Sequence, residues 1–274
     1  MRDERITPLL DNNHKKKKEF KSLSSIVNSK SKVTKARKKT KTKQDGWVFS
    51  LAGVHGVGKT TVYEILKKKL SDNLDIKFFP ERLRSIPPVP FGSKNKQIAF
   101  RSELHYQQQM IERNGLIGQF IRNQHNHVAI LDRSPLSTLI YAKALGLPKI
   151  DYDLIYDTFI SVPWQKEYVI YLYAEPKSIM NRIYHRGSLD IQRQKWNEDD
   201  FKYLLRVLNK YAEIFEEFDL KAKKKIVKLD TEHLTPYETV ERVLEIIKYK
   251  SGIQLKNKFS PIRNQKKITS WISN

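Results

Sequence analysis

The chain has 274 residues, of which 39% are hydrophobic and none is cysteine, and its formal charge is +22. The lack of cysteine excludes disulfides, thiolate metal sites and thiol catalysis, and no apolar run reaches the roughly 18 residues that a membrane span needs. We therefore expect a soluble cytoplasmic protein with no membrane span and no signal peptide.

The positive charge is concentrated at the two ends of the chain. Residues 1–45 contain 15 Lys or Arg against 5 Asp or Glu, and residues 250–274 contain 6 against none. Such a polar start cannot bury a core, so we expect a disordered basic extension over 1–45, a folded domain over 46–249 and a basic tail over 250–274. Two interpretations of the ends stay open: weak binding to nucleic acid or an anionic surface, or solvated tails.

The first predicted element is a buried strand over residues 47–52, because its nearly continuous apolar run is typical of a parallel sheet. The sequence GVHGVGKT follows, and an amphipathic helical pattern begins directly after it. Strand, G-x-x-x-x-G-K-T loop and helix together predict a P-loop, whose backbone N–H groups converge on phosphate oxygens. The expected nucleotide-binding residues are Gly53, Val54, His55, Gly56, Val57, Gly58, Lys59, Thr60 and Thr61.

Two side chains of this loop carry chemistry. Lys59 can reach the outer phosphates as a point charge, and the Thr60 hydroxyl can bind Mg²⁺. The alternative interpretation is a glycine-rich turn that binds nothing.

A second strand is predicted over residues 76–79, and Glu81 follows it at the edge where substrates of open α/β sheets bind. If the acceptor of a phosphoryl group is a hydroxyl, Glu81 is the natural general base. A phosphate acceptor needs no base, and a nearby arginine should hold it. The alternative is that Glu81 only pairs with Arg84 or Arg101.

Helical patterns cover residues 96–114 and, after Gly115, residues 116–124, and a third strand over 128–131 closes on Asp132 and Arg133. An acidic residue at the end of a buried strand beside a P-loop is where such enzymes hold Mg²⁺ or its water. We therefore predict a metal role for Asp132. Alternatively, Asp132 and Arg133 form an ion pair that ends the strand, or Asp132 caps the next helix.

The rest of the core continues this alternation. Helices are predicted over 136–145 and 152–160, a strand over 168–173, a helix from Pro176 to about His185, and a last strand over 225–229 followed by a helix. Before that last strand, a long helix is expected to bury Phe201, Leu204, Leu205, Leu208, Ala212 and Phe215. Five strands alternating with helices predict an α/β fold of the P-loop NTPase type, a five-stranded parallel sheet with helices on both faces.

The helix after the fourth strand carries Arg182 and Arg186. Their spacing of four puts both guanidiniums on one helix face, and neither has an acidic partner at i±4. Arginines on a short lid stabilise the charge that spreads over a transferred phosphoryl group. The alternative is an exposed basic face.

Four segments resemble the thymidylate kinase and deoxynucleoside kinase group of P-loop kinases. GVHGVGKTT, PERL, LDRSPLSTLIYA and RIYHRGSLD occur in that family's order, over about residues 47–249. The resemblance implies that Lys59 and Thr60 handle ATP and Mg²⁺ and that Glu81 and Arg133 face the acceptor. It also implies a lid built from Arg182 and Arg186.

The chain also departs from the family pattern. PERL stands where thymidylate kinases usually show REPG. Thr138 stands where deoxynucleoside kinases usually carry an aspartate, and Ser188 stands where they usually carry a third lid arginine. Whether Arg193 takes the place of that arginine is left open. The glutamine that reads the base in that family corresponds to Gln107 or Gln108.

The predicted function is ATP-dependent phosphoryl transfer to a nucleoside or a nucleoside monophosphate. Two alternatives remain: a P-loop kinase of another small metabolite, since fold does not fix substrate, and a P-loop ATPase or regulator that binds nucleic acid through its basic tails. A GTPase and an ABC-type ATPase are not expected, because N-K-x-D and L-S-G-G-Q segments are missing. A homodimer is left open.

Overall fold

A five-stranded parallel sheet forms the centre of the fold, as seen in a computed structural model that describes residues 45–84, 94–186, 197–218, 220, 223 and 225–255. The strand order is β2-β3-β1-β4-β5, which places β1 in the middle and β2 and β5 at the edges. The strands are β1 (Trp47–Ala52), β2 (Ile76–Phe79), β3 (Val128–Asp132), β4 (Glu167–Tyr173) and β5 (Ile226–Asp230). The predicted fold class is confirmed.

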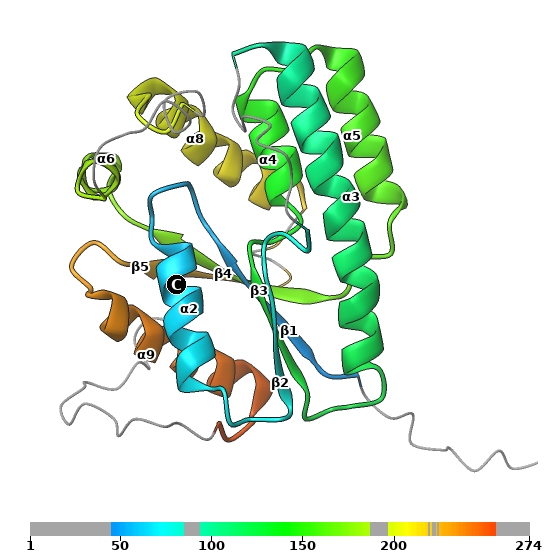
Figure 1. Cartoon of the computed structure of the whole chain (residues 1–274), viewed down its shortest axis with the longest axis vertical. Helices are drawn as coiled ribbons and strands as arrows, with labels where there is room; N and C mark the ends of the chain where they lie inside the picture. The colour runs from blue at the N-terminus through cyan, green and yellow to red at the C-terminus, as the bar shows by residue number, and fades with distance from the viewer. Residues whose placement is uncertain are drawn as a thin grey trace, which may run out of the picture. The chain divides into compact units, whose positions relative to one another are not determined.

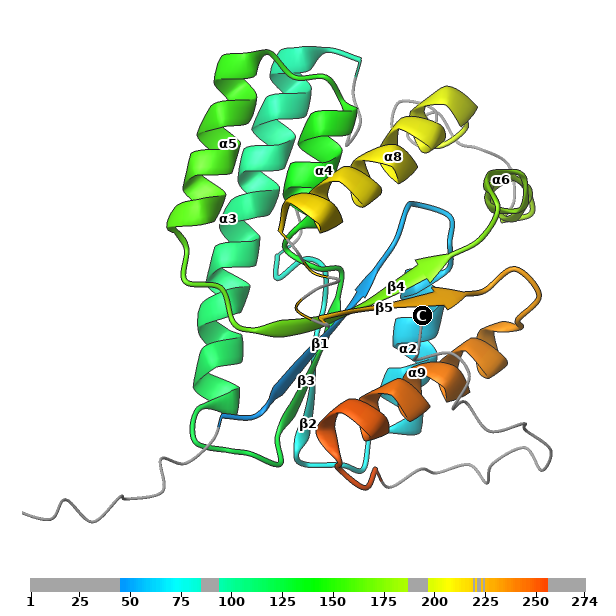
Figure 2. The same cartoon turned by 180° about the vertical axis from the view of Figure 1, so that it is seen from behind.

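Helices cover both faces of this sheet (Figures 1 and 2). On one face α2 (Lys59–Lys69) packs against α9 (Pro236–Ser251), and on the other α3 (Lys96–Ile121), α4 (Ser137–Ala144) and α5 (Lys149–Ser161) lie side by side. The helix α8 (Phe201–Glu217) contacts α4, and α6 (Pro176–Tyr184) follows β4 and contacts α8.

Burial on both faces explains the apolar strands. In β1, Val48 faces the cluster that contains Ile117 and Ile121 of α3, whereas Phe49 and Leu51 belong to the larger core cluster. All three strand residues are almost fully buried. A strand covered on both sides has no solvent-facing positions, so its sequence shows no polar alternation.

Residues 96–121 form one helix, so the predicted interruption at Gly115 is wrong. A glycine inside a helix costs only about 1 kcal/mol relative to alanine. The side chains of Met110 and Ile117, on either side of Gly115, are only 1% and 2% exposed. The packing of these side chains offsets the low helix propensity of glycine.

The buried face of α8 differs from the predicted one. Phe201 and Leu205 are 40% and 36% exposed, and the inward positions instead include Tyr203, Val207 and Tyr211. The pattern misled because hydropathy ranks tyrosine as half polar, whereas these rings are buried near the P-loop. Leu204 and Phe215 are buried as predicted.

Several predictions concern residues outside the described ranges. They include the extension before residue 45, the chain after residue 255, the proline-rich loop near residues 86–92, and Ser188 and Arg193 in the predicted lid. None of the helices in the described part of the chain combines the length and apolar character needed to cross a membrane.

Candidate functional site

The P-loop joins the carboxyl end of β1 to the start of α2, and its glycines are required by space. Gly53 and Gly56 have φ angles of 143° and 79°. A Cβ atom would lie 2.6 Å from the Leu172 carbonyl oxygen at Gly53, and 2.6 Å from Ile183 Cγ1 at Gly56. The loop therefore packs directly on the end of β4 and on α6, which a larger residue would prevent.

The Lys59 side chain lies inside this loop. Its Nζ atom donates hydrogen bonds to the Gly53 and Val54 carbonyl oxygens, each at 2.9 Å. Burial, and then the positive charge of Arg133, lowers the pKa of Lys59 to about 8. A nearby anion would favour the charged form of this ammonium.

Two tyrosines from distant helices hold the loop. Tyr211 Oη on α8 accepts from the Gly53 N–H at 3.2 Å and donates to the Gly53 carbonyl oxygen at 2.8 Å. Tyr141 Oη on α4 accepts from the His55 N–H at 3.1 Å. These contacts span 158 and 86 residues of sequence, so no local motif could have indicated them.

Glu81 and Arg133 form a close ion pair between the carboxyl ends of β2 and β3. Arg133 Nη1 donates to Glu81 Oε1 at 2.6 Å, and Tyr106 Oη donates to the same oxygen at 3.2 Å. Burial raises the pKa of Glu81, but the charges of Arg133 and Lys59 outweigh it and hold that pKa below its usual value. Glu81 is therefore a carboxylate at neutral pH.

This pair settles one of the alternatives. Arg84 pairs with Glu112, so the interpretation that Glu81 only pairs with Arg84 or Arg101 is wrong. Arg133 is held further by aromatic rings, with its guanidinium carbon 4.4 Å from the ring centre of Tyr141.

Arg113 connects the ends of β2 and β3 at this corner, and no sequence motif indicates its role. It is fully buried on α3, and its Nη1 donates to the Pro80 and Asp132 carbonyl oxygens at 3.0 and 2.8 Å. Its Nη2 donates to the Arg133 carbonyl oxygen at 2.7 Å. Arg113 thus joins the ends of β2 and β3, and it holds Arg133 at a positive φ of 77°.

Asp132 lies beside the P-loop with an unused oxygen. Its side chain is buried, and within the described residues Oδ1 has no hydrogen-bond partner. Burial, and then the charge of Glu81, raises the pKa of Asp132. Thr60 is exposed in the first turn of α2.

The two predicted lid arginines have different surroundings. Arg182 Nη1 donates to Thr231 Oγ1 at 3.1 Å and to the Val57 carbonyl oxygen at 3.3 Å, and Nη2 donates to the Thr231 carbonyl oxygen at 2.6 Å. Arg182 therefore ties α6 to the P-loop and to the end of β5. Arg186 instead lines the cavity described next.

A cavity of about 240 Å³ connects the P-loop with the Glu81–Arg133 pair. Its lining residues are His55, Gly56, Gly58, Lys59, Thr60, Glu81, Arg82, Glu103, Arg133, Tyr141, Arg186, Glu198 and Tyr203. The two predicted base-reading glutamines do not line it: Gln107 Nε2 donates to the Ile155 carbonyl oxygen at 2.8 Å, and Gln108 is exposed. Glu103, on the same helix, takes their expected place in the wall of the cavity.

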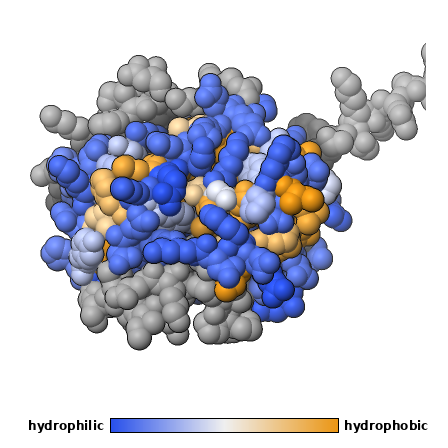
Figure 3. Space-filling view, turned by 90° about the horizontal axis from the view of Figure 1, so that it is seen from above, coloured by the Kyte–Doolittle hydropathy of each residue, from blue (hydrophilic) through white to orange (hydrophobic). Residues whose placement is uncertain are grey.

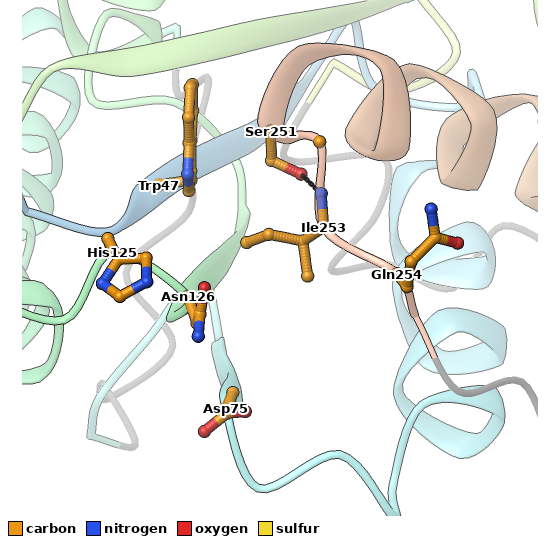
Figure 4. A pocket seen from close by; sticks show the side chains of 8 residues that line it. Trp47, Asp75, His125, Asn126, Ser251, Ile253 and Gln254 are labelled. Atoms are coloured by element: carbon orange, nitrogen blue, oxygen red, sulfur yellow. Dashed lines mark hydrogen bonds between the residues drawn. The ribbon is translucent and has the colours of Figure 1, made fainter.

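A larger cavity of about 420 Å³ lies at the opposite, amino edge of the sheet (Figure 4). Trp47 begins β1, and Asp75 and Asn126 precede β2 and β3. None of the predicted site residues lines it. The chemistry is therefore gathered in the smaller cavity, at the carboxyl edge, as expected for an open α/β sheet.

Residues 49–250 match the family described as deoxynucleoside kinase. The chain belongs to this family. It is accordingly a kinase, a phosphotransferase that phosphorylates deoxynucleosides or nucleotides. A comparison with curated proteins gives no significant match.

Solved structures with the same fold include a nucleotide kinase and a deoxynucleoside kinase. The thymidylate kinase of Candida albicans is 20% identical with a TM-score of 0.57, and the match covers 78% of this chain and 96% of that one. The M. mycoides deoxyadenosine kinase with bound dATP is 19% identical, with a TM-score of 0.57 and coverage of 73% and 98%. The same enzyme with bound dCMP and dCDP is 18% identical with a TM-score of 0.58, and the match covers 74% of this chain and 99% of that one.

Proposed function

We propose that this kinase transfers the γ-phosphoryl group of ATP to a hydroxyl of a deoxynucleoside, rather than to the phosphate of a nucleotide. The observation that carries the proposal is the Glu81 carboxylate, which is ionised and lines the same cavity as Lys59. A hydroxyl must lose its proton as it attacks, and a carboxylate at this place can accept it.

Lys59, Arg82 and Arg186 also line this cavity, but the engagement of Arg133 argues against an acceptor phosphate bound beside Glu81. An acceptor phosphate requires a cation that is available to bind it. Arg133 is engaged by Glu81 at 2.6 Å and enclosed by aromatic rings. A phosphate placed here would also meet the negative charge of Glu81.

The residues around the P-loop fit a magnesium nucleotide. Mg²⁺ commonly takes one or two protein oxygens and completes its shell with water and phosphate oxygens. Asp132 Oδ1 is a buried oxygen without a partner among the described residues, and the Thr60 hydroxyl is exposed at the start of α2. These two would hold the ion, which when bound neutralises charge on the phosphates.

The remaining roles follow from position. The loop N–H groups and Lys59 would hold the donor phosphates, and Glu81 would accept the proton of the attacking hydroxyl. Arg133 keeps Glu81 ionised and oriented. Arg186 lines the cavity and is suited to stabilise the moving phosphoryl group, whereas Arg182 positions α6.

Phosphorylation assays test this proposal. The full chain is incubated with ATP, Mg²⁺ and a panel of deoxynucleosides and their 5′-monophosphates, and the products are separated by chromatography. We expect transfer to at least one deoxynucleoside, and none by Lys59→Ala. Transfer to monophosphates alone would overturn the proposal.

A further inference from the structure

Glu103 is a buried acid that the roles above leave unused. It lies on α3, is 3% exposed and lines the cavity. Among the described residues, no hydrogen bond or ion pair reaches its carboxyl group, whereas Glu81 in the same cavity has two donors. A buried carboxyl group without partners is costly unless a ligand supplies them.

A second polar group in the cavity wall is also unsatisfied. Tyr203 Oη on α8 is buried without a hydrogen-bond partner in the described part of the chain, and the ring of Tyr203 stacks on that of His55, with centroids 5.7 Å apart. The Glu103 carboxyl lies close enough to contribute to the raised pKa of Tyr203. Glu103 therefore belongs to a wall of flat rings with unsatisfied polar atoms.

The surroundings of Glu103 favour its uncharged form. Burial raises its pKa to about 8, with Arg133 opposing that shift and Glu81 adding to it. The other titratable or charged groups that line or adjoin this cavity include His55, Lys59, Arg82, Tyr106, Tyr141, Arg186, Glu198, Tyr203 and Arg206. Arg206 lies over the ring of Tyr203, 5.5 Å from its centre.

We propose that Glu103 binds the base of the acceptor. In the uncharged form that its surroundings favour, the carboxyl group donates one hydrogen bond and accepts another. The inference rests on the proposed function, which makes the acceptor a deoxynucleoside. A base offers a donor and an acceptor side by side, such as the amino group and neighbouring ring nitrogen of adenine or cytosine. A sugar hydroxyl offers both on one atom.

The position of Glu103 on α3 agrees with this role. Tyr106, three residues later, donates to Glu81. Three residues of helix advance about 4.5 Å, so Glu103 lies one turn farther along α3 from the reacting hydroxyl. Such a separation is suitable for the part of a nucleoside that does not react.

The first experiment compares Glu103→Leu and Glu103→Gln with the wild-type full chain. Leucine removes both hydrogen bonds, whereas glutamine keeps a donor and an acceptor. We expect Glu103→Leu to raise KM for deoxyadenosine or deoxycytidine at least about tenfold, with KM for ATP changed less than about threefold. Glu103→Gln should keep the wild-type values within about threefold at pH 7. Glu112→Leu, which changes an exposed glutamate of the same helix, is the matched control.

A second arm removes the contact from the ligand. Purine 2′-deoxyriboside lacks the amino group of deoxyadenosine. It should therefore bind the wild type more weakly than deoxyadenosine does, whereas Glu103→Leu should bind the two nucleosides equally well. A penalty for a 3′-deoxy sugar that Glu103→Leu abolishes would instead assign Glu103 to the sugar and overturn the inference.

The pH profile reports on the proton of Glu103. Wild-type kcat/KM for the acceptor should fall as pH rises through about 8, where the carboxyl loses its donor, and Glu103→Gln should not show this fall. Lys59 also titrates near this pH, but it is common to both proteins. Parallel profiles, or an unchanged KM in Glu103→Leu, would overturn the inference. A wild type that phosphorylates no deoxynucleoside would overturn the proposed function instead.

Discussion

Glu81 and Arg133 lie at the ends of two neighbouring strands, so the strand order brings them together. Opposite charge keeps Glu81 ionised in a buried place, where a lone carboxyl would become protonated. Glu103 lies in the same cavity, but no residue in the described part of the chain forms an ion pair with it, and its pKa moves the other way. Two glutamates in one cavity are thus given different protonation states by their neighbours.

Replacing Glu81 with glutamine should remove the proton acceptor while keeping the shape of the side chain. We expect kcat with a deoxynucleoside to fall about 100-fold or more, with a smaller change in KM. Tyr106→Phe, which removes only one hydrogen bond to Glu81, should lower kcat less than about tenfold. Steady-state kinetics at saturating ATP measure both, and equal losses in the two variants would contradict the base assignment.

Replacing Arg113 with methionine should affect stability more than any exposed arginine does. The guanidinium satisfies three carbonyl oxygens at the ends of β2 and β3. Leaving these buried groups unpaired should lower the free energy of unfolding by about 3 kcal/mol or more, which corresponds to a melting temperature about 6–12 °C lower. Arg122→Met, at an exposed position, is the control for thermal denaturation. Equal melting temperatures would show that water replaces the guanidinium.

At the scale of whole elements, strands were predicted more accurately than helix faces. Buried strands have a simple signature, an apolar run that ends at a polar residue such as Asp132, and their bounds agree within about one residue. The face of α8 was misplaced because its tyrosines are buried for their contacts with the P-loop. Such contacts depend on tertiary structure, which a pattern within one helix does not contain.

The same distinction applies to the site. The P-loop, Asp132 and Arg133 lie in short motifs, so their positions could be read from the sequence. Arg113 and Glu103 are single charged residues on a long helix, and only the packing of α3 on the sheet shows their surroundings. The sequence could not indicate which polar residues of α3 turn inward.

The helix α6 carries the two arginines in different settings, and their removal should have different effects. Arg186→Ala should lower kcat about 100-fold with KM for ATP nearly unchanged. Arg182→Ala should lower the melting temperature and raise KM for ATP, because it frees α6 from Val57 and Thr231. Kinetics and thermal denaturation of both variants test this, and the opposite assignment of effects would refute it.

For the molecule as a whole, the excess of positive charge comes mainly from residues outside the described site. Hydrophilic residues predominate on the face shown in Figure 3. In the sequence, residues 1–44 carry 15 basic and 4 acidic side chains. The described site holds both glutamates and arginines. The role of the basic residues in this segment is open to a direct test.

Deleting residues 1–44 should leave kcat/KM for the deoxynucleoside within about twofold. Binding of single-stranded DNA at low salt should weaken markedly, because phosphate contacts by Lys and Arg supply most of such non-specific affinity. Fluorescence anisotropy at two salt concentrations measures the binding, and charge-neutral dextran serves as a control for crowding. Unchanged DNA binding would show that the extension is only a solvated tail.

The raised pKa of Glu103 also predicts how the stability of the protein depends on pH. The folded state keeps this proton up to about pH 8, whereas an unfolded chain releases it near the usual value of 4.5. Between these values the folded state binds more protons, so the contribution of Glu103 to the free energy of unfolding falls as pH rises. Glutamine does not titrate, and Glu103→Gln should therefore gain stability over the wild type across this window, by up to about 4 kcal/mol at pH 8.

Urea denaturation of both proteins at pH 5 and pH 8 measures the difference. Lys59 and Asp132 also titrate abnormally but are present in both proteins. A difference that is independent of pH would show that Glu103 is ionised in the folded protein.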